Sequence, residues 1–183
     1  CALLVLVIPA FASEIDWREE ATRLEQFHGL PTNLLTGICT TESHWRPDAV
    51  GPGGEIGLCQ LKPYLAASLK RPPSRPTDGE AVARFQKYAR IRVDGLIGPE
   101  TAQALKTVEH GRAVLALFDP YENLHLAALY LVSLREQLNV NDFNLLAIAY
   151  NGGPGSPAVR YAVKVRNGNG LLKKTVEGEK TIR

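Results

Sequence analysis

The chain has 183 residues, of which 45% are hydrophobic, and this length and composition suffice for one packed domain with a small additional segment. The formal net charge is only +2, and no dense stripe of lysine and arginine occurs, which argues against a nucleic-acid binder. The sequence pI of about 8.5 suits weak attraction to an anionic cell wall, although many unrelated proteins share it.

Residues 1–12 form an uncharged apolar run that ends in an Ala-Phe-Ala triplet, the A-x-A form at which secretion signals are cleaved. The run is too short to span a bilayer, and charged residues begin at Glu14. We therefore predict that this run is the remnant of a secretion signal and that the protein acts in the periplasm or outside the cell, without stable membrane insertion. A buried N-terminal helix is the alternative.

Two of the three cysteines would remain after removal of the signal, because Cys1 would leave with it. The remaining pair, Cys39 and Cys59, predicts a disulfide in a secreted domain. A pair of small buried thiols is the alternative.

Apolar periodicity predicts a mainly α protein, and no strong strand pattern stands out. A capping box over residues 13–16 opens a first helix that extends to about His28, and Thr32 or Asn33 can cap the second. A glycine-rich irregular loop is predicted over residues 48–60 and a linker over residues 70–79. Further predicted helices cover residues 34–43, a segment around Val82 and Phe85, and residues 99–106, 120–138, 142–150 and 158–165.

Glu42 lies near the C-terminal end of an apolar predicted helix. The helix dipole and partial burial both favour the protonated form of a carboxyl group at such a position. A protonated glutamate held against apolar surface can protonate the leaving oxygen of a glycosidic bond. A solvated glutamate at the end of a helix is the alternative.

Two later segments carry polar side chains that suit a sugar ligand. Gln60 follows the glycine-rich loop, and its amide can both donate to and accept from hydroxyl and acetamido groups. Tyr150 could hydrogen-bond the acid or stack on a sugar, and Asn151 could bond an acetamido group. An ordinary turn and a helix C-cap explain these segments equally well when each is taken singly.

Taken together, the motifs Glu42-Ser43, Gly57-Leu-Cys-Gln60 and Ala149-Tyr-Asn-Gly-Gly153 resemble those of the soluble-lytic-transglycosylase-like domain, a relative of goose-type lysozyme. That family shows Glu-Ser, Gly-Leu-Met-Gln and Ala-Tyr-Asn-x-Gly in the same order and at similar spacings. The resemblance covers about residues 14–68 and 117–166. Further matches are Asn123, Tyr130-Leu131 and Tyr161-Ala-Val-Lys-Val165.

The resemblance implies a lysozyme-like fold and a role for each motif. Glu42 is then the catalytic acid/base, and Ser43, Gln60, Tyr150 and Asn151 bind the substrate or support the site. The family cleaves the β-1,4 bond from N-acetylmuramic acid to N-acetylglucosamine in peptidoglycan and forms a 1,6-anhydro ring. Because the attacking oxygen belongs to the substrate, no second carboxylate is needed to activate water. No cofactor is expected, and the four histidines show no metal-ligand spacing.

The chain also departs from the family pattern. Gly51 stands in place of the family's Ser, Glu55 in place of a small residue and Cys59 in place of Met, and the segment from Gly153 to Tyr161 is short. The changes leave the catalytic assignment intact and concern the substrate subsites. Because the resemblance places the segments of both cysteines along one cleft, it favours the Cys39–Cys59 disulfide.

A second resemblance lies within residues 71–113, which are predicted to interrupt a catalytic domain of residues 13–70 and 114–166, with a polar tail over 167–183. Ala81-Val-Ala-Arg-Phe-Gln86 and Val93-Asp-Gly-Leu-Ile-Gly-Pro-Glu-Thr101 are similar to one repeat of a peptidoglycan-binding module. The resemblance implies wall binding through a turn that contains Asp94, Gly95 and Gly98. A helix–turn–helix insertion that binds nothing is the alternative.

The sequence therefore predicts a lytic transglycosylase, expected as a monomer that acts on peptidoglycan glycan strands. A hydrolytic muramidase that uses Glu42 with Glu55 or Asp48 as the water-activating base is one alternative. A non-catalytic wall-binding or assembly protein that has kept the fold is the other. The sequence leaves open an association with secretion or conjugation machinery.

Overall fold

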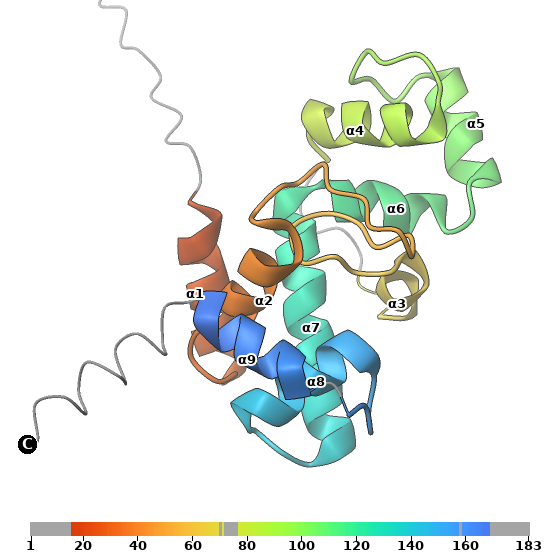
Figure 1. Ribbon diagram of the computed structural model, residues 1–183. Helices are drawn as coiled ribbons and strands as arrows, with labels where there is room; N and C mark the ends of the chain where they lie inside the picture. Colours follow the sequence, from red (N-terminus) through yellow and green to blue (C-terminus); the bar gives the residue numbers. More distant parts are fainter. Residues whose placement is uncertain (1–15, 70, 72–76, 158, 169–183) are drawn as a thin grey trace, which may run out of the picture.

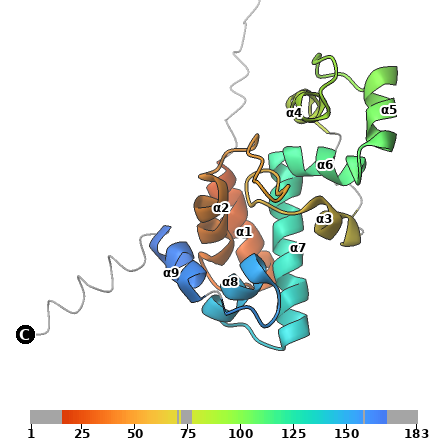
Figure 2. The same cartoon turned by 45° about the vertical axis from the view of Figure 1, so that its right-hand side comes forward.

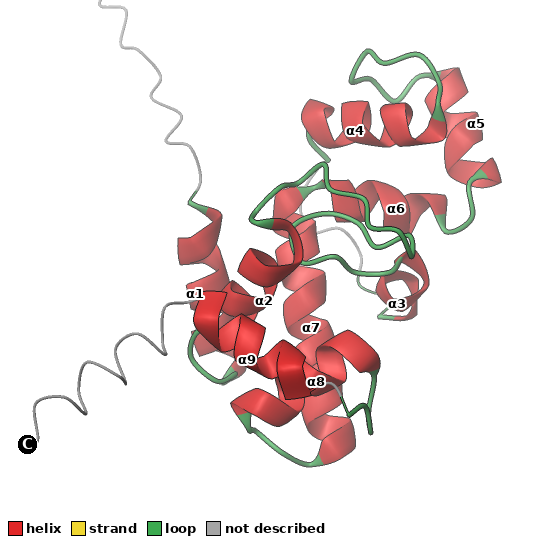
Figure 3. Cartoon of the chain, viewed as in Figure 1, coloured by secondary structure: helices red, strands yellow, loops and turns green. Residues whose placement is uncertain are grey.

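The computed structural model describes residues 16–69, 71, 77–157 and 159–168. Within these residues the regular secondary structure is helical (Figure 3). Ile56 also makes two isolated β-bridges, with Val50 and Leu61. The predicted mainly α fold is confirmed. The predicted signal remnant and the tail beyond Gly168 lie outside the described residues. None of the described helices is long and apolar enough to cross a membrane.

Five of the described helices, the long helix α7 among them, make up the larger part of the fold (Figure 1). Helix α2 packs against α1, α8 and α9, while α7 packs against α1 and α8. Leucine and alanine side chains fill the core between them, including Leu35 and Leu131, which are fully buried. The five are α1 (Trp17–His28), α2 (Leu34–Ser43), α7 (Pro120–Leu138), α8 (Phe143–Gly152) and α9 (Val159–Gly168).

The remaining four described helices lie toward the N-terminal end of α7 (Figure 2). Helices α4 and α5 both pack on α6, which in turn packs on α7 and α3. Phe85 of α4 and Phe118 of α6 are buried in this part of the core. Helices α3 and α6 were not predicted. The four are α3 (Pro63–Ser68), α4 (Gly79–Ala89), α5 (Pro99–Thr107) and α6 (Gly111–Phe118).

Local capping residues explain where several helices begin. Asp119 accepts hydrogen bonds from the backbone N–H groups of the first turn of α7, and Pro120 follows it at the first helical position. Asp142 caps α8 in the same way. The first helix begins at Trp17 with Asp16 as its N-cap, so the predicted capping box starts too early.

Helix α2 is capped from a distance. Asn33 occupies the N-cap position, but its side chain makes no capping hydrogen bond. The carboxylate of Glu25 in α1 instead accepts from the backbone N–H groups of Asn33 at 2.7 Å and Thr36 at 2.9 Å. The prediction of a local cap was therefore wrong, and the start of the helix that carries Glu42 is fixed by α1.

Candidate active site

A cleft of about 460 Å³ lies where the end of α2 meets the glycine-rich loop, α3, α7 and α8. Four of the predicted site residues line it, namely Glu42, Gln60, Tyr150 and Asn151. A larger hollow of about 890 Å³ lies between α3, α5, α6 and α7 and contains none of them. The tertiary fold thus brings three segments that are far apart in the sequence to one cleft.

Glu42 lies in the last turn of α2, and its carboxyl group is partly buried. Burial raises its pKa, and the negative charge of Glu55 raises it further. A hydrogen bond from Tyr161 and the positive charge of Lys164 act in the opposite direction, but the net shift is upward. Glu42 is therefore held toward its protonated form, as a general acid requires.

Tyr161 is the hydrogen-bond partner of this acid. Its hydroxyl donates to Oε1 of Glu42 at 2.5 Å. Burial raises the pKa of Tyr161 far above its ordinary value, so the hydroxyl keeps its proton and acts as a donor. Tyr161 comes from α9, which packs on α2. Tyr161 belongs to a motif that matches the family, but the sequence alone predicted no contact between it and Glu42.

Tyr150 makes a different contact from the suggested bond to the acid. Its hydroxyl donates to the backbone oxygen of Cys59 at 2.8 Å, so it fastens the loop to α8. Its ring lies 5.4 Å from that of Tyr130, which also lines the cleft. Glu42 raises the pKa of Tyr150 as a secondary cause after burial, which is consistent with the expected proximity of the two side chains.

Ser43 is a support of the loop. Its side chain is 1% exposed, and its hydroxyl donates to the backbone oxygen of Leu58 at 2.6 Å. It does not line the cleft described above. Ser43 therefore supports the loop, as the resemblance also implied, and does not reach a substrate in the cleft directly.

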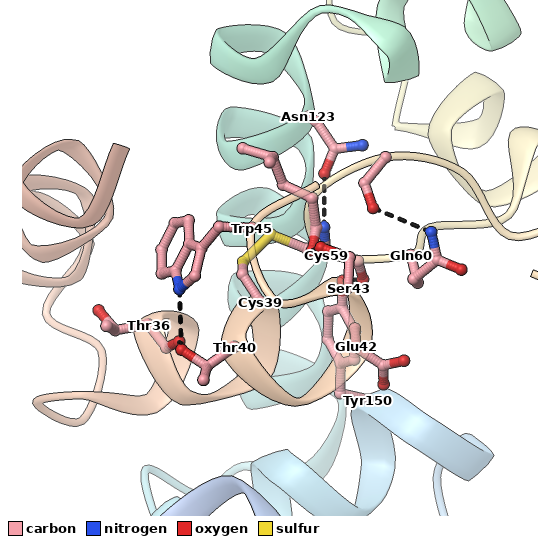
Figure 4. The surroundings of a disulfide bond; sticks show 12 residues. Thr36, Cys39, Thr40, Glu42, Ser43, Trp45, Cys59, Gln60, Asn123 and Tyr150 are labelled. Atoms are coloured by element: carbon pink, nitrogen blue, oxygen red, sulfur yellow. Dashed lines mark hydrogen bonds between the residues drawn. A yellow bond between two sulfur atoms is a disulfide. The ribbon is translucent and has the colours of Figure 1, made fainter. Parts of the chain in front are cut away.

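Two further ties hold the same loop. Cys39 of α2 and Cys59 form a disulfide, which joins the helix that carries Glu42 to the segment that carries Gln60 (Figure 4). Asn123 of α7 is fully buried and accepts from the backbone N–H of Cys59 at 3.0 Å. Its amide group donates to the backbone oxygen of Ile56 at 2.9 Å. Residues 56–60 are thus fixed from α2, α7 and α8 together.

This close approach depends on a glycine. Gly57 has a φ of +79°, and a Cβ atom at this position would lie 2.3 Å from Nδ2 of Asn123. Only glycine combines this backbone conformation with the space that Asn123 occupies. The Gly-Leu-Cys-Gln60 motif therefore begins with a residue that lets the loop reach α7.

Gln60 and Asn151 line the cleft from two different segments of the chain. The Nε2 atom of Gln60 donates to the backbone oxygens of Ala49 at 3.2 Å and Gly57 at 2.9 Å, so its amide is held within the loop. Its Oε1 atom lies beside Gly51, also in the lining, where it can accept from a substrate donor. Asn151 is exposed at the end of α8.

The family model described as the transglycosylase SLT domain matches residues 20–81 and 96–167. The chain belongs to this SLT family. Members of the family are lytic transglycosylases that act on peptidoglycan, in agreement with the resemblance found in the sequence. A comparison with curated proteins found no match.

Glu55 lines the same cleft of this SLT domain as Glu42. Asp48 instead lines a separate hollow of about 220 Å³, together with residues of α4 and α6. Of the two water-activating candidates from the sequence, only Glu55 shares a cavity with Glu42. Within the described residues, no group of three or more His, Cys, Asp or Glu side chains is arranged to hold a metal ion.

The residues predicted for wall binding, Asp94, Gly95 and Gly98, form a surface turn between α4 and α5. Gln86 is 1% exposed, and its Oε1 atom accepts from the backbone N–H groups of Asp94 and Gly95, both at 2.9 Å. Its Nε2 atom donates to Oδ1 of Asp94 at 2.8 Å. Gly95 has a φ of +72°, and Gly98 stands at the N-cap position of α5. These contacts explain how the residues of the motif hold the turn in its folded shape. Wall binding stays a prediction.

Proposed function

We propose that this SLT domain is a lytic transglycosylase that cleaves the β-1,4 bond between N-acetylmuramic acid and N-acetylglucosamine in peptidoglycan, with Glu42 as its acid/base. The observation that carries the proposal is the partly buried carboxyl of Glu42, which has a raised pKa and lies in the cleft lined by Gln60 and Asn151. A protonated carboxyl beside polar groups that can fix a sugar is the minimum that the chemistry requires.

In the first step, the carboxyl of Glu42 gives its proton to the glycosidic oxygen. The bond from that oxygen to C1 of the muramic sugar breaks, and its electron pair leaves with the N-acetylglucosamine. Glu42 is then a carboxylate, and the hydroxyl of Tyr161 stabilises the negative charge through its hydrogen bond. In the second step, O6 of the muramic sugar bonds to C1, and Glu42 takes the O6 proton. No water is consumed, and Glu42 ends protonated as it began.

The alternative of a hydrolytic muramidase rests on Glu55, because this carboxylate shares the cleft with Glu42. Hydrolysis would add one water to each product and leave a reducing muramic acid. A non-catalytic assembly protein is disfavoured because Glu42 and Gln60 line one cleft and because Tyr161 donates a hydrogen bond to the carboxyl of Glu42.

The deciding experiment is a digestion of purified peptidoglycan, followed by mass analysis of the released muropeptides. We expect 1,6-anhydromuramic products, each one water lighter than the product of hydrolysis. A digest dominated by reducing muramic acid would establish the muramidase instead. If neither product forms, the assembly protein is favoured.

We further propose a periplasmic or extracellular location, supported by the disulfide between Cys39 and Cys59, since such bonds persist in oxidising compartments. Fractionation of cells that produce the full-length precursor tests this location. Recovery of the protein in the cytosol with two free thiols would contradict it.

A further inference from the structure

Glu55 occupies a central position in the small loop that faces Glu42. Ile56 forms antiparallel bridges with Val50 on one side and Leu61 on the other. In an antiparallel register the residues next to a bridged pair also face each other. Glu55 therefore lies between Gly51, whose N–H donates to the backbone oxygen of Glu55 at 2.8 Å, and Lys62.

The carboxylate of Glu55 is held by two partners. Its Oε2 atom accepts from the backbone N–H of Gly53 at 2.9 Å, and its Oε1 atom lies 3.5 Å from Nζ of Lys62. The side chain of Glu55 is 26% exposed, and both Glu55 and Lys62 line the cleft with Glu42. A carboxylate with these two partners keeps a defined position in the cleft.

The space that this carboxylate occupies exists because residue 51 is a glycine. A Cβ atom on Gly51 would lie 2.6 Å from Oε2 of Glu55 and 2.7 Å from Oε1 of Gln60. Such distances are too short for atoms that are not bonded, so any larger residue must displace the two side chains. The two departures from the family pattern, Gly51 for Ser and Glu55 for a small residue, are therefore physically coupled.

We propose that Glu55 is a second carboxylate of the active cleft, which places a fixed negative charge beside the sugar at which Glu42 acts. This inference rests on the proposed glycosidase function. Cleavage of a glycosidic bond passes through a transition state in which positive charge develops on the sugar ring. A preorganised negative charge in a partly enclosed cleft stabilises that positive charge.

The same charge acts on the acid itself. Glu55 is one of the groups that raise the pKa of Glu42, while Tyr161 and Lys164 lower it. Catalysis by Glu42 begins from its protonated form, so activity falls on the alkaline side as the pH passes the pKa of Glu42. Removal of the charge of Glu55 should therefore move this alkaline limb to lower pH.

The first test is Glu55→Gln, which keeps the shape of the side chain and removes its charge. We expect kcat to fall by roughly 10-fold or more with a small change in KM, because the interaction is made in the transition state. The alkaline limb of the pH profile should shift to lower pH. Glu55→Asp keeps the charge and should keep the limb close to its original position. Asp48→Asn is the matched control, since Asp48 lines a different hollow, and it should leave the limb unchanged.

The second test is a double-mutant cycle between Gly51 and Glu55. Gly51→Ser, which introduces the family's residue, should lower kcat because its Cβ displaces the carboxylate. In a Glu55→Ala background, the same substitution should cost less, because only the side chain of Gln60 is then left to be displaced. Additive effects would contradict the coupling.

The outcomes separate this inference from the proposed function. An unchanged kcat and pH profile in folded Glu55→Gln, with anhydro products still formed, would overturn the role of Glu55 and leave the transglycosylase intact. Products that change from hydrolysed to anhydro in Glu55→Gln would also overturn it, since Glu55 would then act on water. Full activity in Glu42→Gln would instead overturn the proposed function.

Discussion

The hydroxyl of Tyr161 lies 2.5 Å from Oε1 of Glu42 and joins the last described helix to the acid at the end of α2. The two residues are 119 positions apart in the chain. The contact ties the protonation of the site to the packing of α9 on α2. Tyr161 is the strongest of the groups that lower the pKa of Glu42, and it thus offsets part of the effect of burial.

Substitution of this tyrosine should change the pH profile in the opposite sense from loss of Glu55. In Tyr161→Phe the hydrogen bond that favours the carboxylate is lost, so the pKa of Glu42 rises and the alkaline limb moves to higher pH. The carboxylate formed after the first step also loses a donor worth about 1.5–3 kcal/mol. We expect kcat to fall roughly 10- to 100-fold. Tyr150→Phe is the control: its hydroxyl bonds Cys59, so the limb should move little.

Substitution of Glu42 itself should give the largest loss of activity. Glu42→Gln retains the size of the side chain and its capacity to accept from Tyr161, but it cannot pass a proton to the glycosidic oxygen. Turnover of peptidoglycan should fall at least about 100-fold, as is typical when general acid–base catalysis is lost. A folded variant with near-normal turnover would exclude Glu42 as the acid.

The same variant should be more stable than the natural protein at neutral pH. The pKa of Glu42 is raised in the folded state, mainly by burial, so the ionised group destabilises the fold. This destabilisation is absent below the ordinary pKa of a glutamate, grows as the pH rises from there to the raised pKa, and is constant above it. The difference in Tm between Glu42→Gln and the natural protein should therefore grow from acid to neutral pH. A constant difference across this range would contradict the raised pKa.

Capping residues that lie next to a helix in the sequence allowed the start of that helix to be predicted. Asp119-Pro120 and Asp142 marked the starts of α7 and α8 because each carboxylate caps the first turn of its own helix. Helix α3 has only six residues, too few for an apolar period to be recognised. Helix α6 begins at Gly111, within a segment that was assigned to the insertion.

The contacts that were missed depend on the tertiary fold. Glu25 caps α2 across 11 positions, and Tyr161 reaches Glu42 only because α9 packs on α2. The residues around the cleft could be named from the family motifs, since each motif is continuous in sequence. The sequence could not show that Tyr161 bonds Glu42 while Tyr150 bonds the loop. Both side chains carry the same hydroxyl donor, and only the packing of α8 and α9 decides which acceptor each one reaches.

The disulfide between Cys39 and Cys59 provides a last prediction. It closes a loop of 20 positions, for which the chain-entropy model gives a stabilisation of about 3 kcal/mol. Ser43, Asn123 and Tyr150 also hold residues 58 and 59, so the cleft should keep its shape when the bond is opened. Reduction should therefore lower the midpoint of urea unfolding strongly and turnover only modestly, by less than about 10-fold. A Cys39→Ala/Cys59→Ala variant serves as the control and should not respond to reductant. In denatured, unreduced protein that lacks Cys1, thiol titration should find no reactive thiol, and two reactive thiols would refute the bond.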